Sequence, residues 1–121
     1  MTLTVQSLIE GQRRKLGARK HLLLPKAIEA KLPALYATED IPTADKKIIV
    51  KFFTPDSSWT WWVVEGSRDE DGDMRFFCLV EGLVTEWGYT MLSELETTKG
   101  PMGLSIERDK WFDNKYIRDV T

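Results

Sequence analysis

Four stretches between residues 47 and 92 show the apolar alternation or the short apolar runs that are typical of β-strands. They are KIIVKFF (47–53), WTWWVVE (59–65), RFFCLVE (75–81) and TEWGYTML (85–92). Turn-forming residues separate them, namely Pro55, the pair Asp71-Gly72, and Gly82. Short connections of this kind join antiparallel neighbours, so the pattern predicts a four-stranded antiparallel β-meander.

Helical patterns lie on either side of these strands. The stretch LLLPKAIEAKL (22–32) has Pro25 at a position that the first turn of a helix tolerates, and it is predicted to be helical. After the last strand, SELE (93–96) resembles a capping box in which Ser93 and Glu96 cap each other's backbone amides. The expected fold class is α+β, with the meander packed against helices from the N-terminal part and a short helix after the last strand.

Tight turns would also decide which residues face each other across the sheet. They place Phe52 opposite Trp59, and Cys78 opposite Trp87. One face of the sheet is then almost wholly apolar, and we predict that it is the core face. It comprises Ile48, Val50, Phe52, Trp59, Trp61, Val63, Phe76, Cys78, Val80, Trp87, Tyr89 and Met91.

The opposite face is only half apolar and allows two interpretations. It is either a second small core that Trp111 and Phe112 close over, or an exposed patch anchored by Trp62 that binds a partner. On the register above, this face also carries Thr60, Val64, Gly88 and Thr90. The candidate partner-binding residues on it are Trp62, Phe77, Leu79, Ile49, Lys51, Arg75 and Glu86.

The composition is that of one folded domain, with 121 residues of which 42% are hydrophobic and 30% charged. Cys78 is the only cysteine, so no internal disulfide can form and a reducing compartment is expected. No apolar run approaches the roughly 18 residues of a membrane span, and no signal peptide is evident. We therefore expect a cytoplasmic protein without a membrane partner, with a basic N-terminal segment (1–21) and a single α+β domain (22–121).

Charge is unevenly distributed along the chain, although the net charge is only -2. Residues 1–31 carry seven Lys/Arg and two Glu, which gives +5, whereas residues 32–121 carry ten Lys/Arg and seventeen Asp/Glu, which gives -7. The acidic remainder repels phosphate, so binding to duplex DNA is not expected. If the basic segment nevertheless contacts nucleic acid, the residues concerned would be Arg13, Arg14, Lys15, Arg19 and Lys20.

No motif for catalysis, metal binding or cofactor binding is present in the sequence. The only histidine, His21, has no nucleophile beside it, and Cys78 lies between apolar neighbours where it behaves as a small hydrophobe. The acidic run 69–73 departs from a calcium loop, because the sixth position is Met74 and the twelfth is Val80. We expect no catalytic residues, no metal and no cofactor.

Three longer stretches together resemble a family of bacterial proteins. They are LPALYATEDIPTADKKIIVKFFTPDSSWTWWVVEG (32–66), FFCLVEGLVTEWGYTMLSELE (76–96) and GPMGLSIERD (100–109). On these motifs the chain is similar to the domain-of-unknown-function family 2958 over residues 22–112. The resemblance implies no activity, cofactor or catalytic residue. It implies service to a mobile genetic element, because members are typically encoded on plasmids, phages and integrative elements.

Three functions follow as hypotheses. The first is a non-enzymatic interaction module of a mobile genetic element that binds a protein partner through the aromatic, mixed-charge sheet face. The second is an anti-defence inhibitor, in which the acidic body mimics nucleic acid and occupies a host defence nuclease. The third is a single-stranded nucleic-acid binder with exposed aromatic rings as stacking platforms.

Overall fold

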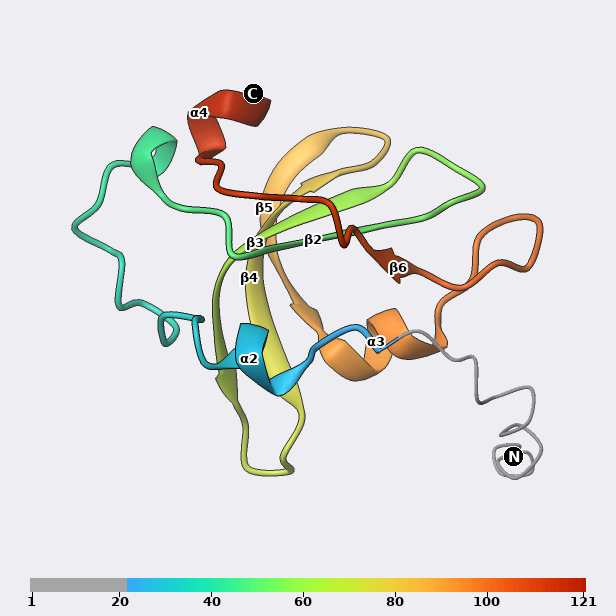
Figure 1. Cartoon of the computed structure of the whole chain (residues 1–121), viewed down its shortest axis with the longest axis horizontal. Helices are drawn as coiled ribbons and strands as arrows, with labels where there is room; N and C mark the ends of the chain where they lie inside the picture. The colour runs from blue at the N-terminus through green and yellow to red at the C-terminus, as the bar shows by residue number, and fades with distance from the viewer. Residues whose placement is uncertain (1–21) are drawn as a thin grey trace.

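The computed structural model describes residues 22–121. Its centre is a five-stranded antiparallel sheet in the spatial order β5-β4-β3-β2-β6 (Figure 1). The strands are β2 (Val50–Phe53), β3 (Thr60–Arg68), β4 (Met74–Glu81), β5 (Thr85–Met91) and β6 (Glu107–Arg108). The α+β class with an antiparallel sheet is confirmed. The sequence pattern did not predict β6, because a strand of two residues is too short to show alternation.

The helical elements are short. They are α2 (Lys26–Glu29), the 3₁₀ helix η2 (Thr43–Asp45), α3 (Leu92–Thr97) and α4 (Ile117–Val120). The predicted helix over 22–32 was wrong in extent, since only α2 forms within it. The residue that precedes a proline disfavours the helical conformation, and this limits the helix at Leu24 before Pro25 and at Leu32 before Pro33.

Helix α3 lies where the capping pattern predicted a helix, and it buries Leu92 and Leu95. The capping group differs from the prediction. The carboxylate of Glu94, rather than that of Glu96, accepts the backbone N–H of Met91 at 2.9 Å. Ser93 instead donates its hydroxyl to Asp73 of the neighbouring hairpin at 2.5 Å, which ties the start of α3 to the sheet.

The register between β2 and β3 differs from the prediction by two residues, because the loop between the strands is longer than a tight turn. The backbone N–H of Thr54 donates to the carbonyl of Trp59, and Phe52 consequently faces Trp61 instead of Trp59. A shift of two residues keeps the paired side chains, Val50–Phe53 and those of residues 60–63, on their predicted faces. Trp61 is accordingly buried, whereas Trp59 is 39% exposed and stacks on Trp61 with the ring centroids 6.1 Å apart.

The register between β4 and β5 differs by one residue, and this shift reverses the faces of β5. Glu81 pairs with Thr85 across a three-residue loop, so Cys78 faces Gly88 instead of Trp87. Trp87 and Tyr89, which were predicted to lie on the core face, therefore lie on the opposite face together with Met91. Glu86, Gly88 and Thr90 move to the core face.

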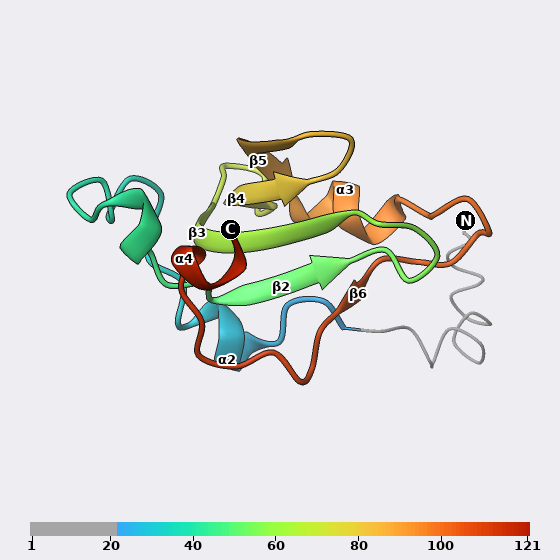
Figure 2. The ribbon, with the colours of Figure 1, turned by 90° about the horizontal axis from the view of Figure 1, so that it is seen from above.

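The two faces of the sheet each carry a core. The first core comprises Leu23, Leu24, Val50, Phe52, Trp61, Val63, Met74, Phe76, Cys78, Leu92, Leu95 and Ile106. The second core comprises Ile48, Val64, Leu79 and Ile117, against which Trp62, Phe77, Trp87, Phe112 and Val120 pack. Figure 1 shows α2 and α3 below β2 and α4 above it, and Figure 2 shows β2 to β5 side by side.

Ile48 was predicted to lie in the first core but belongs to the second. Residues 48 and 49 are outside any strand, and the chain at residues 47 and 48 pairs with the C-terminal segment. Lys47 forms a bridge with Tyr116, and the N–H of Ile48 donates to the carbonyl of Lys115 at 2.9 Å. This pairing brings the C-terminal segment across the second face of the sheet.

Candidate functional site

The second face of the sheet carries two rows of side chains across β3, β4 and β5. One row is Trp62, Leu79 and Trp87, and the other is Glu65, Phe77 and Tyr89. Five of the predicted partner-binding residues share this face, namely Trp62, Phe77, Leu79, Lys51 and Arg75. Of the other two, Ile49 lines an adjacent cavity and Glu86 lies on the opposite face because of the β5 register.

The half of this face around Trp62 is covered by the C-terminal segment. The ring of Phe112 lies 6.0 Å from that of Trp62, and the indole N–H donates to Glu81 at 3.1 Å. The Lys51 ammonium group lies 5.1 Å from the Trp62 ring centroid. Of the two residues expected to close this face, only Phe112 does so, whereas Trp111 is 93% exposed. Around Trp62, the interpretation of a second core is the one that the packing supports.

The other half of the face is open and aromatic. The ring of Phe77 stacks on Trp87 with the centroids 5.0 Å apart, and it lies 5.2 Å from Tyr89. Tyr89 is 47% exposed, and the guanidinium of Arg75 lies 5.9 Å from its ring centroid. The Tyr89 hydroxyl donates to the hydroxyl of Tyr36, which is 59% exposed, at 3.2 Å. We call Tyr36, Arg75, Phe77, Trp87 and Tyr89 the open aromatic patch.

A buried carboxylate holds Tyr36 in this position. A bulge in β3 between Val63 and Glu65 turns Glu65 onto the second face, where it is 3% exposed. Its Oε1 accepts the N–H of Tyr36 at 2.8 Å, and its Oε2 accepts the N–H of Thr38 at 3.1 Å as well as the Thr38 hydroxyl. Tyr36 has a φ of 72°, a left-handed conformation that is costly for a bulky residue.

The ionisation of these groups follows from their surroundings. Burial alone would raise the pKa of Glu65, but hydrogen bonds from the Thr38 hydroxyl and from the backbone of Tyr36 and Thr38, with the charge of Lys46, lower it overall. The Lys46 ammonium donates to the carbonyl and to the hydroxyl of Thr38, at 2.5 and 2.9 Å. The hydrogen bond to Tyr36 raises the pKa of Tyr89. Glu65 is therefore an anion whose two carboxylate oxygens both accept hydrogen bonds. Tyr89 is neutral, and its hydroxyl donates to Tyr36.

Sequence reasoning missed Tyr36, Glu65 and Tyr89. Tyr36 stands in a polar loop with no periodicity, and the face of Tyr89 depended on a loop length. Glu65 did carry a signal, since strict alternation after Trp61 and Val63 would point a carboxylate into the apolar core. Such a conflict indicates a bulge.

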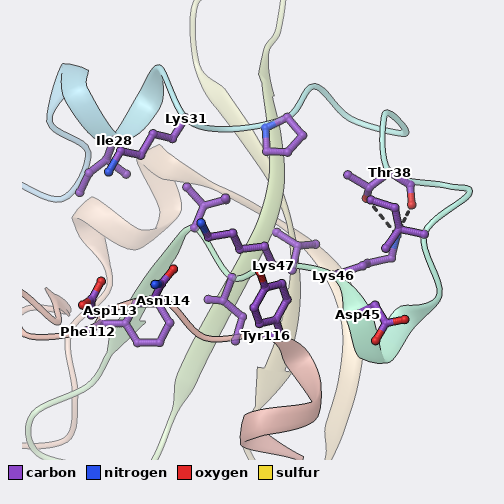
Figure 3. A pocket seen from close by; sticks show the side chains of 15 residues that line it. Ile28, Lys31, Thr38, Asp45, Lys46, Lys47, Phe112, Asp113, Asn114 and Tyr116 are labelled. Atoms are coloured by element: carbon purple, nitrogen blue, oxygen red, sulfur yellow. Dashed lines mark hydrogen bonds between the residues drawn. The ribbon is translucent and has the colours of Figure 1, made fainter.

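A cavity of about 640 Å³ lies between the loop that carries Thr38, the start of β2 and the C-terminal segment (Figure 3). Ile48, Ile49, Val64 and Phe112 give it an apolar floor. Two of its charged groups have internal partners, because Lys46 donates to Thr38 and Asp45 pairs with Arg118 at 2.5 Å. Lys31 and Lys47 also line it.

The other residues considered for catalysis or metal binding lie in surroundings that indicate a structural role. Burial raises the pKa of the Cys78 thiol to about 12, so the thiolate nucleophile is suppressed. In the acidic hairpin, Asp69 accepts the backbone N–H groups of Asp71 and Asp73 at 2.9 and 3.1 Å. Residues 22–121 contain no group of three or more His, Cys, Asp or Glu side chains placed to hold a metal ion. His21 and the basic residues proposed to contact nucleic acid lie outside the described residues.

Among residues 22–121, none of the helices has the length and apolar character needed to cross a membrane.

The fold and the site together define a small antiparallel α+β domain with a half-covered aromatic face. The chain belongs to the family described as "Protein of unknown function (DUF2958)", whose model matches residues 23–117, and this confirms the resemblance seen in the sequence. No curated protein and no solved structure matches the chain.

Proposed function

We propose that the protein is a non-enzymatic interaction module that binds a protein partner through the open aromatic patch. The observation that carries the proposal is the pair Tyr36 and Tyr89, which are 59% and 47% exposed and joined by their hydroxyl groups. Tyrosine and arginine are enriched where protein interfaces gain most of their energy. The patch contains both, on a floor of Phe77 and Trp87.

The rigidity of the patch supports the proposal. Binding is weakened when side chains must be ordered at the moment of contact. Tyr36 is already ordered, because Glu65 accepts its backbone N–H and Tyr89 contacts its hydroxyl. A strained backbone of this kind costs about 1–3 kcal/mol and is found preferentially at functional sites. The strain at Tyr36 therefore favours a role in recognition over a role in folding alone.

The setting in which this module works also belongs to the proposal. We infer that it serves a mobile genetic element in the cytoplasm, as the family resemblance implies. The predicted contact residues Arg75 and Phe77 remain in the proposed interface. Lys51, Trp62 and Leu79 then support the patch from the covered half of the face.

The anti-defence inhibitor is the second candidate. Its support is the charge of -7 on residues 32–121, which an enzyme groove built for nucleic acid would attract. On this hypothesis the partner is a basic protein, and binding weakens steeply as salt is raised. A partner held through the aromatic patch should dissociate far less readily in salt.

The test is affinity capture from a native host, followed by mass spectrometry. Wild-type protein should capture a partner that Tyr36→Ala and Tyr89→Ala lose. The matched control is Trp111→Ala, which removes an aromatic ring that is 93% exposed and outside the patch. Thermal unfolding of each variant separates lost binding from lost folding. Capture of the same partner by a folded double variant of Tyr36 and Tyr89 would contradict the proposal.

A further inference from the structure

Strand β5 forms one edge of the sheet, and Glu86 is the only charged residue that protects this edge. It is seven residues long, whereas β6 at the other edge has two. Its pairing with β4 runs without a bulge from Thr85 to Met91, and its sequence contains no lysine, arginine or proline. In the part of the chain that the structure describes, no strand pairs with its outer side. Natural proteins usually blunt such edges with charges, proline or bulges.

We propose that two copies of this chain associate by antiparallel pairing of their β5 strands. The proposal does not rest on partner binding, although Trp87 and Tyr89 belong both to β5 and to the open aromatic patch. A two-fold axis through Gly88 is the arrangement that pairs the whole strand, because it sets Thr85 opposite Met91 of the second copy. Two five-stranded sheets would then become one continuous sheet.

The side chains of β5 are self-complementary in this register. Trp87 faces Tyr89 of the second copy, and aromatic cross-strand pairs of this kind stabilise antiparallel sheets. The only charged residue of the strand, Glu86, faces Thr90 of the second copy. An axis through Glu86 would instead set two carboxylates opposite each other and would shorten the overlap. The sequence of β5 thus favours the register centred on Gly88.

Gly88 gives a direct test of the axis. It lies on the first face opposite Cys78, and a Cβ added to it would meet no atom within 4 Å. Substitutions at this position should therefore leave the monomer folded. In the proposed dimer, Gly88→Glu places two carboxylates face to face, each diagonal to Glu86 of the other copy. Gly88→Gln has nearly the same shape without the charge and is the matched control.

Sedimentation equilibrium of the full chain should give twice the chain mass of 14.0 kDa for the wild type and for Gly88→Gln. For Gly88→Glu, the dissociation constant of the dimer should rise at least about tenfold, because directly opposed like charges destabilise a strand pair. Mixing Gly88→Glu with Gly88→Lys should restore a dimer that contains both variants, since opposite charges then meet at the axis.

Two results would overturn the proposal. One is a wild-type protein that stays monomeric at the highest attainable concentration. The β5 edge would then be free to pair with a strand of another protein. The other is a dimer whose dissociation constant is the same for Gly88→Glu and Gly88→Gln. Circular dichroism and thermal unfolding of each variant check that a change in mass comes from the interface.

Discussion

At the scale of single residues, Glu65 shows how a buried charge is tolerated in a small domain. An unpaired carboxylate in an apolar interior is costly, but Glu65 accepts three hydrogen bonds from the loop at Tyr36 and Thr38. The same hydrogen bonds satisfy the backbone N–H groups of Tyr36 and Thr38. One residue of β3 thus helps to hold a loop that is distant in sequence, together with Gly66 and Ser67.

Glu65→Gln should lower the free energy of unfolding by about 2–4 kcal/mol, because charge-assisted hydrogen bonds are lost and an amide N–H₂ faces backbone donors. Urea unfolding at neutral pH measures the change. Glu70→Gln, which removes one carboxylate from the exposed hairpin tip, is the control and should shift stability by less than about 0.5 kcal/mol. Equal stability of the two variants would contradict the anchoring role of Glu65.

Cys78 gives a second prediction at this scale. Its side chain is fully buried, and burial raises the pKa of the thiol to about 12. The thiolate is the reactive form, so the native protein should resist thiol reagents at neutral pH. Labelling with a chromogenic disulfide should begin only when urea unfolds the domain. Rapid stoichiometric labelling of the native protein would show that this part of the sheet opens easily.

At the scale of elements, the four long strands were predictable because alternation and turn residues are local signals. The face of β5 was not, since one residue in the loop after Glu81 reverses the side chains of Trp87 and Tyr89. The bulge at Glu65 and the pairing of the C-terminal segment with Lys47 were also hidden, because both depend on contacts between distant parts of the chain. The sequence therefore identified some residues of the site, such as Arg75 and Phe77, but not how the residues of the site are arranged.

The C-terminal segment is predicted to stabilise the sheet through Trp62. Trp62→Ala removes the contact with Phe112 and the hydrogen bond to Glu81, and it should cost about 2–4 kcal/mol of unfolding free energy. A loss of about 1 kcal/mol lowers the unfolding midpoint of a domain of this size by roughly 5 °C. Trp111→Ala, the exposed neighbour of Phe112, should leave the midpoint nearly unchanged. A stable Trp62→Ala variant that loses its partner would instead favour Trp62 as an interface anchor.

At the scale of the whole molecule, the second face has two halves that differ in what covers them. The C-terminal segment covers one half and adds a core where the sheet would otherwise be exposed. The other half keeps its aromatic residues accessible beside the unprotected edge of β5. The proposed partner surface and the proposed dimer edge are thus neighbours, and Trp87 and Tyr89 contribute to both.

Acid should destabilise the domain, and Glu65 should account for a measurable part of the effect. The pKa of Glu65 is lowered in the folded state from its usual value of 4.5, so its contribution is complete above that value. The contribution is lost as the pH falls through the lower, folded-state pKa, because protonation of the carboxyl is then easier in the unfolded chain. Urea unfolding at a series of pH values should therefore show stability falling below about pH 4.5 in the wild type. The fall in stability should be shallower in Glu65→Gln and the same as in the wild type in Glu70→Gln. If the free energy of unfolding changes with pH equally in the wild type and in Glu65→Gln, the folded-state pKa of Glu65 is not lowered.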